Sequence, residues 1–354
     1  MGRGGAGESA ARHASDRLAG SRYRRGVTRA TGMGSWPGTD VRETQRAVRS
    51  LLAEDGLPYL PELPDRGPGA DMIGRAAALL VDLAVDLQPM GWRFVDRPGR
   101  DLERARSFWR QDLDELAETY DGYEGELKVQ VTGPWTLAAS IWLHRGERSV
   151  VDEGAVRDLA GSLVEGLRDH VAEVERLVPG ARVVLQLDEP SLPAVLAGRL
   201  PTASGYGTIR AIDSYAAANL LGEVLAAAGD RPTVVHCCAK GAPLPLLRTT
   251  GASALAVDAT VLGPKGWESL ATTVEAGTDV WVGAFTSAAP LPTVGQVHDG
   301  LVRRWHELGL AASDLAGVTI SPACGLAGLG PADAVAAQRL AVQAAEAVTE
   351  TAMR

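Results

Sequence analysis

The chain has 354 residues, 45% of them hydrophobic and 22% charged, which is enough to bury a core in one large domain or two modest ones. A formal net charge of −9 argues against a broad basic surface for nucleic acid or anionic membranes, so small molecules are the expected partners. No apolar run is long enough to span a membrane, and three cysteines do not make a disulfide framework, which favours a reducing, cytoplasmic setting.

The first 26 residues carry six arginines among Gly, Ala and Ser and show no apolar periodicity, which predicts a disordered tail. They also lack the apolar core of a secretory signal peptide. We therefore place one folded domain at residues 27–354.

From residue 27 on, short apolar runs alternate with longer amphipathic stretches, which is typical of repeated βα units. The eight runs predicted as strands are 27–35, 57–62, 127–134, 183–190, 233–239, 254–260, 280–286 and 318–324. The stretches predicted as helices are 41–54, 71–85, 102–120, 153–177, 212–228, 266–276, 294–308 and 331–350. The second run is the weakest strand because prolines interrupt it. This order predicts a single (β/α)8 TIM barrel.

Reactive side chains follow most of these predicted strands at the point where each strand ends. They are Ser35, Glu62, Asp188, Glu189, His236, Cys238, Asp258 and Cys324. Because a β/α barrel builds its active site at the carboxyl ends of its strands, we expect these side chains to meet at one face.

The stretch "TVVHCCAK" places a histidine directly before two of the three cysteines. Alternate strand residues share a face, so His236 and Cys238 are expected to point the same way and Cys237 the opposite way. With Asp258 and Cys324 they offer nitrogen, sulfur and oxygen donors that suit a zinc ion. The spacing is not that of a zinc finger, so the alternative stays open that these residues only pack in the core.

Five motifs together resemble the catalytic C-terminal half of cobalamin-independent methionine synthase, in the uroporphyrinogen decarboxylase-like superfamily of barrels. The motifs are "GMGSWPGT", "TGPWTL", "QLDEPSL", "HCC" and "SPACGL". The resemblance runs from about Thr31 to the C-terminus, whereas the family's full-length enzymes have an additional N-terminal half.

The resemblance implies a zinc-dependent methyltransferase that makes methionine from homocysteine. The family's zinc ligands fall on His236, Cys238 and Cys324, and its glutamate ligand falls on Asp258, which is one methylene shorter. The amino-acid substrate would be held by the backbone around Met33 and by the side chains of Ser35, Glu62 and Asp188.

The chain departs from the family on the side of the methyl donor. Ala288 stands where the family has a histidine, and the tryptophan that stacks on the folate has no match beyond the nearby Trp135 and Trp142. These differences favour a methylated corrinoid or corrinoid protein over methyltetrahydrofolate as the donor. Two alternatives remain: a zinc methyltransferase for another thiol, and a non-catalytic barrel that binds an amino acid or zinc.

Overall fold

A computed structural model describes residues 27–52, 54 and 56–354, so the tail predicted at residues 1–26 lies outside the described part. Seven parallel strands form one curled sheet in the order β1-β9-β8-β7-β6-β5-β4. The strands are β1 Arg29–Ala30, β4 Gly125–Thr132, β5 Ala181–Asp188, β6 Thr233–Cys237, β7 Ala254–Asp258, β8 Asp279–Phe285 and β9 Val318–Pro322. All seven lie inside or overlap runs predicted as strands.

The second predicted strand, residues 57–62, does not form a regular strand but lies between the two edges of this sheet. Isolated parallel bridges join it to residues next to β1 and to β4. The Leu57 N–H donates to the Ala30 carbonyl at 2.8 Å, and the Lys128 N–H donates to the Pro58 carbonyl at 2.9 Å. Since proline has no N–H to donate, the ladder here cannot be continuous. The structure thus shows a curled seven-stranded sheet with a bridging segment in place of eight regular strands.

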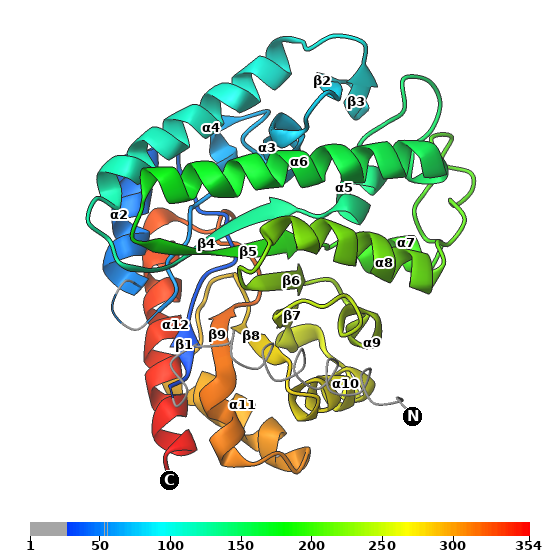
Figure 1. Cartoon of the computed structure of the whole chain (residues 1–354). Coiled ribbons are helices and arrows are strands. Elements are labelled where there is room, and N and C mark those ends of the chain that lie inside the picture. Colours follow the sequence, from blue (N-terminus) through cyan, green and yellow to red (C-terminus); the bar gives the residue numbers. More distant parts are fainter. Residues whose placement is uncertain (1–26, 53, 55) are drawn as a thin grey trace, which may run out of the picture.

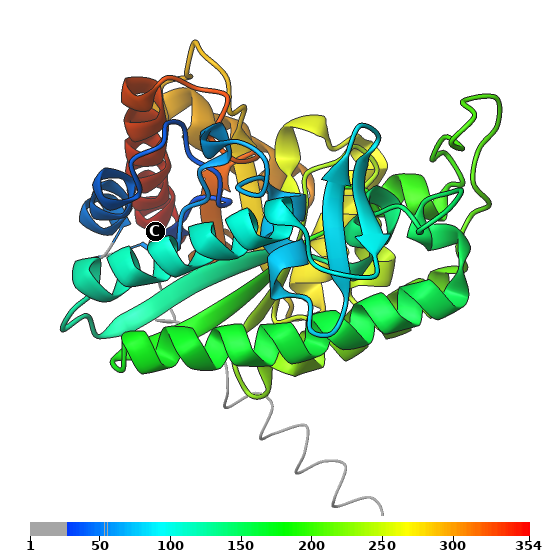
Figure 2. The same ribbon diagram turned by 90° about the horizontal axis from the view of Figure 1, so that it is seen from above.

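Helices cover the outer face of the sheet, as the alternating pattern predicted (Figures 1 and 2). The longer ones are α2 Val41–Leu52, α3 Met72–Leu79, α4 Arg100–Thr119, α6 Glu153–Leu177, α8 Ser214–Leu225, α10 Pro264–Glu275, α11 Val294–Glu307 and α12 Pro331–Ala352. Short helices follow three strand ends: α5 Pro134–Ser140, α7 Leu192–Leu196 and α9 Leu244–Leu247. Buried carboxylate Glu189 supports the start of α5, since it accepts hydrogen bonds from the backbone N–H groups of Trp135 and Thr136.

One prediction in this region was wrong: the helix expected over residues 71–85 ends at Leu79. Residues beyond it form an antiparallel hairpin, β2 Ala84–Gln88 and β3 Gly91–Val95, outside the main sheet. The sequence alternates apolar residues on both strands around a two-residue turn, and Gly91 adopts a positive φ of 118° at that turn. The tight turn and the period of two override the helical pattern.

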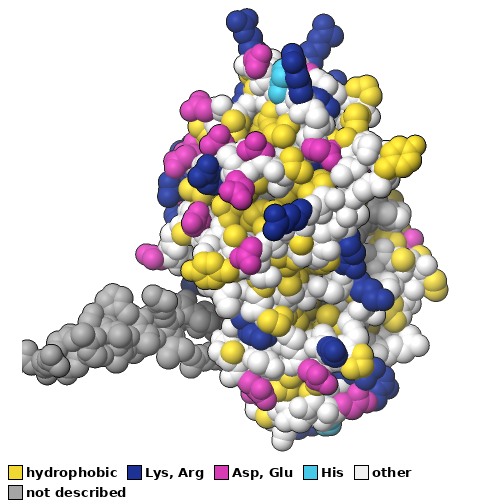
Figure 3. Space-filling model, turned by 90° about the vertical axis from the view of Figure 1, so that its right-hand side faces the viewer, with side chains coloured by type: hydrophobic (Ala, Val, Ile, Leu, Met, Phe, Trp, Pro, Cys, Tyr) yellow, Lys and Arg dark blue, Asp and Glu magenta, His cyan; other side chains and the backbone are white. Residues whose placement is uncertain are grey.

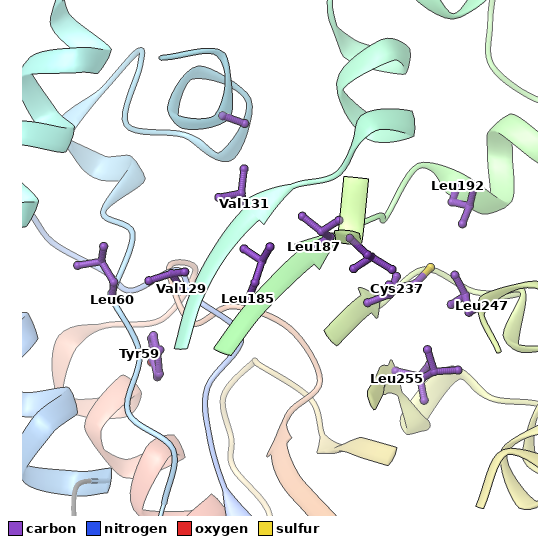
Figure 4. Packing of buried hydrophobic residues seen from close by; sticks show 14 of the residues in the cluster. Tyr59, Leu60, Val129, Val131, Leu185, Leu187, Leu192, Cys237, Leu247 and Leu255 are labelled. Carbon is purple, nitrogen blue, oxygen red and sulfur yellow. The ribbon is translucent and has the colours of Figure 1, made fainter. Parts of the chain in front are cut away.

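The two faces of the sheet bury different kinds of side chain. Alternate residues such as Val129, Leu185, Cys237 and Leu255 pack outward against the helices (Figure 4). The inner face holds a small separate apolar cluster of Met33, Leu57, Val184, Val234, Ala254, Ala256 and Trp281. The inside of the curled sheet therefore has room for polar groups nearer the strand ends.

No helix in the described part of the chain is long and apolar enough to cross a membrane. On the face shown in Figure 3, acidic and basic side chains are interspersed among hydrophobic ones.

Candidate functional site

Two cysteines 86 residues apart in the sequence meet at the carboxyl ends of β6 and β9. The sulfur atoms of Cys238 and Cys324 lie 3.6 Å apart, close enough to share a hydrogen bond. This hydrogen bond lowers the pKa of the Cys324 thiol to about 6, with a further contribution from nearby His236, and it raises the pKa of Cys238. Cys237 instead points outward, where burial raises its pKa to about 12. The predicted alternation along "HCC" is thereby confirmed.

His236, on β6, is held from one side only. Its Nδ1 lies 2.7 Å from the Asp188 Oδ1 on the neighbouring strand β5. Its Nε2 is buried and has no hydrogen-bond partner among the residues that the structure describes. Buried polar atoms are normally paired, so a bare ring nitrogen next to a thiol pair is the feature expected where a metal binds.

A polar network lies below these residues on the inner face of the sheet. The Lys128 ammonium is fully buried and donates to the Met33 carbonyl, Gln130 Oε1 and Gln186 Oε1 at 3.2, 3.2 and 2.9 Å. The Gln186 amide in turn donates to Asp188 Oδ1 at 2.7 Å and to the Met33 carbonyl at 2.9 Å. The backbone of Met33, predicted to contact the substrate, is thus fixed through its carbonyl.

Glu62 is buried between this network and a cluster of charged residues under α4. Burial raises its pKa to about 7, an effect that nearby Asp188 reinforces and Arg75 opposes. The Arg75 Nε lies 3.7 Å from Glu62 Oε1, and the guanidinium also pairs with Asp112. Glu62 and Asp188, the two carboxylates predicted to bind a substrate ammonium, are therefore close enough to influence each other.

Ser35 lies beside the loop that carries Cys324. Its carbonyl accepts a hydrogen bond from the Leu326 N–H at 2.8 Å, and a Cβ placed on Gly325 would lie 1.9 Å from the Ser35 Oγ. Only a glycine fits there without movement. Ser287, in the loop after β8, bonds to both backbone polar groups of Cys324, at 2.8 and 3.0 Å.

Asp258 ends β7 but turns its carboxylate toward its own chain. Its Oδ1 accepts hydrogen bonds from the N–H and the hydroxyl of Thr260, at 2.8 and 2.6 Å. Among the residues that the structure describes, no group of three or more His, Cys, Asp or Glu side chains is arranged as a metal site. The four-ligand set of His236, Cys238, Asp258 and Cys324 thus stays a prediction.

The donor atoms that are present nevertheless suit zinc. Two sulfurs bound at about 2.3 Å to a tetrahedral zinc ion lie about 3.8 Å apart, close to the 3.6 Å separation of Cys238 and Cys324. The His236 Nε2, unpaired among the described residues, would be a third donor.

Both tryptophans near the expected donor side are buried in the fold. The Trp135 Nε1 donates to the Ala217 carbonyl at 3.0 Å, which ties α5 to α8. The Arg148 guanidinium lies 4.8 Å from the centre of the Trp142 ring. Ala288 lies exposed in the loop after β8.

Sequence reasoning missed Lys128, Gln130, Gln186 and Ser287. The signal for the first three was present, because "LKVQVT" and "VVLQLD" place polar residues two apart in otherwise apolar strands. Ser287 carried no such signal, since its partner lies 37 residues away.

Comparisons with known proteins place these residues in a wider context. Residues 28–347 match a family model described as "Cobalamin-independent synthase, Catalytic domain". No curated protein matches. A solved B12-independent methionine synthase from Shewanella sp. W3-18-1, in complex with selenomethionine, is 15% identical with a TM-score of 0.45, over 66% of this chain and 65% of that one. The carboxyl transferase domain of Rhizobium etli pyruvate carboxylase is 14% identical with a TM-score of 0.25, over 67% and 43%. The chain thus aligns with slightly less than two thirds of the synthase.

Proposed function

The chain belongs to the catalytic-domain family of cobalamin-independent synthases, and from this premise we propose that it transfers a methyl group to the thiol of homocysteine, forming methionine. The observation that carries the proposal is the meeting of Cys238 and Cys324, with sulfurs 3.6 Å apart, beside a histidine whose buried Nε2 is unpaired in the described structure. Three donors from two distant parts of the chain have no evident purpose as packing alone.

In this proposal His236, Cys238 and Cys324 hold a zinc ion, and Asp258 is the fourth predicted ligand. A bound zinc ion would keep a substrate thiol deprotonated at neutral pH, which is the form that attacks a methyl group. The reaction needs free thiols, in keeping with the cytoplasmic setting expected from the sequence.

The residues around the metal position would hold the amino-acid part of the substrate. Glu62 and Asp188 face the same interior, and an ammonium placed between them would form charge-assisted hydrogen bonds. No hydrogen bond between described residues ends on Asp188 Oδ2, which leaves that oxygen for the substrate. Burial of both carboxylates strengthens such contacts by excluding water.

Two observations bear on the identity of the methyl donor. The family description is cobalamin-independent, which favours methyltetrahydrofolate over the corrinoid expected from the sequence. Methylcobalamin is still worth testing as a donor, because Ala288 stands where the family has a histidine and both nearby tryptophans are buried.

The first test is the zinc content of the purified chain by elemental analysis. We expect about one zinc per wild-type chain, and loss of it in Cys238→Ser and in Cys324→Ser. Cys237→Ala is the matched control, because it removes the adjacent thiol that points away from the site, and it should keep its zinc. The proposal would lose its basis if the wild type contained no zinc, or if the zinc content were unchanged in the Cys238→Ser and Cys324→Ser variants.

The second test is methyl transfer to homocysteine, with methyltetrahydrofolate and methylcobalamin supplied side by side and methionine measured. Turnover with either donor supports the proposed reaction and identifies the donor. A zinc-loaded chain that makes methionine from neither donor would contradict it, and a panel of other thiols would then test the alternative acceptor.

A further inference from the structure

Lys128 is an unusual residue for this protein. The chain has only three lysines against thirty-two arginines. Lys240 and Lys265 are exposed, whereas Lys128 is fully buried in the middle of β4. Burying an ammonium costs several kcal/mol unless it is fully hydrogen-bonded, so its presence here calls for a specific reason.

The surroundings of Lys128 match its chemistry. An ammonium has three donors, and three acceptors lie around it: the Met33 carbonyl, Gln130 Oε1 and Gln186 Oε1. Burial lowers its pKa to about 7, and the nearby carboxylates of Asp188 and Glu62 oppose that shift. The larger, planar guanidinium of an arginine would not fit this arrangement.

Lys128 and the Met33 carbonyl together fix which way the Gln186 amide faces, because the Gln186 Nε2 donates to that carbonyl at 2.9 Å. Because an ammonium can only donate, Gln186 must turn its oxygen toward Lys128, at 2.9 Å. Its Nε2 then faces Asp188, to which it donates at 2.7 Å. Asp188 Oδ1 lies in turn 2.7 Å from His236 Nδ1.

The last link decides the state of the histidine. With an ionised carboxylate beside it, Nδ1 of a neutral His236 carries the proton and Nε2 keeps its lone pair. That Nε2 is buried and has no hydrogen-bond partner within the described part of the chain.

We propose that Lys128 is a positioning residue that acts through Gln186 and Asp188 to hold His236 in the Nδ1–H tautomer, with Nε2 directed to a metal. This assignment rests on the proposed function only for the identity of the metal. The relay joins β4, β5 and β6, so it fixes one ligand from a point two strands away.

The test uses the whole chain and two readouts that do not require turnover. The first is the tautomer of His236 in zinc-free protein at pH 7, from imidazole nitrogen chemical shifts, with the signal identified through a His236→Gln variant. The second is zinc affinity, by competition with a chromophoric chelator.

Lys128→Met and Gln186→Met each break the relay. Because Asp188 then loses the support that holds it against His236, we expect both variants to show a mixture of tautomers and to bind zinc more weakly by roughly 10- to 100-fold, the usual effect of removing an outer partner of a metal-binding histidine. Gln130→Met is the matched control, because Gln130 contacts Lys128 but makes no hydrogen bond to Asp188. It should leave the tautomer and the affinity close to wild type.

Wild-type tautomer and zinc affinity in a folded Lys128→Met or Gln186→Met chain would overturn the proposal. Should Lys128→Met fail to fold, Gln186→Met decides alone, since it keeps the ammonium and breaks the next link. A wild-type chain that holds the Nδ1–H tautomer but binds no zinc would contradict the proposed function and leave the relay standing. A wild-type chain that binds zinc and transfers the methyl group but shows a mixture of His236 tautomers would support the proposed function and overturn the relay.

Discussion

Ser287 fixes the peptide of Cys324 from the neighbouring loop. Its hydroxyl donates to the Cys324 carbonyl at 2.8 Å and accepts from the Cys324 N–H at 3.0 Å. Cys324 itself is exposed and lies past the end of β9, so it has no strand neighbour to hold it. The Ser287 hydroxyl therefore fixes the backbone of Cys324, as regular sheet pairing fixes the backbone of His236.

Replacing this hydroxyl should loosen the sulfur pair without unfolding the chain. We expect Ser287→Ala to weaken zinc binding on the order of 10-fold, because an outer hydrogen-bond partner of a proposed ligand is lost. Ser287→Thr keeps the hydroxyl and serves as the control, with affinity near wild type. Chelator competition on both variants measures the effect, and equal affinities for alanine and threonine would show that the loop does not position Cys324.

The residue types at the strand ends were the most informative feature of the sequence, because reactive side chains can be recognised there without knowing their contacts. Cys238 and Cys324 were predicted to share one metal site; the structure brings their sulfurs to 3.6 Å, and the metal itself stays a prediction. The contact between Asp188 and His236 was not foreseen, because it depends on the register of two neighbouring strands. The orientation of Asp258 toward Thr260 was equally hidden, since it is a local turn preference of aspartate.

At the scale of elements, long periodic stretches were predicted well and short irregular ones were not. Helix α6 has the predicted bounds, Glu153–Leu177, because its apolar period persists over many turns. The helix predicted over residues 71–85 reached the first two residues of β2, and the rest of the β2–β3 hairpin was not predicted, since its five-residue strands are too short for a period of two to stand out. The spacing of apolar residues is therefore weak evidence for secondary structure where the helices and strands are short.

Two glycines in α6 offer a direct test of how this helix packs. A Cβ on Gly166 would lie 1.9 Å from the Leu79 carbonyl oxygen at the end of α3, whereas a Cβ on Gly161 would meet nothing within 4 Å. We expect Gly166→Ala to destabilise the fold by about 1–3 kcal/mol, because backbone must shift. The same substitution at Gly161 should stabilise it by up to about 1 kcal/mol through helix propensity.

Denaturant unfolding of the two alanine variants measures both effects against wild type. Because the substitution and the helix are the same, any general effect of alanine on α6 cancels in the comparison. Equal changes in the free energy of unfolding would mean that α3 does not approach α6 as closely as the structure shows.

At the scale of the whole molecule, the sheet was predicted as eight strands and is found as seven with a bridging segment. The prolines that weakened the second strand in the sequence are the physical reason, since they remove donors from the ladder. What the sequence could not show is that the segment still joins both edges of the sheet through backbone hydrogen bonds. It thereby places Glu62 beside the polar interior.

The position of Glu62 ties the stability of the fold to pH. Its pKa in the folded chain is about 7, against an ordinary value of 4.5. Between these values the folded state binds more protons than the unfolded state, so this group lowers stability as pH rises from 4.5 to 7. Above pH 7 the full cost remains, about 3 kcal/mol at most.

Glu62→Gln removes this cost, because the amide has no charge to bury. We expect the variant to gain stability relative to wild type between pH 5 and pH 8, by up to about 3 kcal/mol. Denaturant unfolding of zinc-free protein at both pH values measures the gain. Glu124→Gln, at an exposed position, controls for a general effect of losing a carboxylate. The opposite trend, a variant that loses ground as pH rises, would mean that Arg75 and Lys128 favour the ionised form of Glu62 more than burial disfavours it, and the carboxylate would then be charged throughout this range.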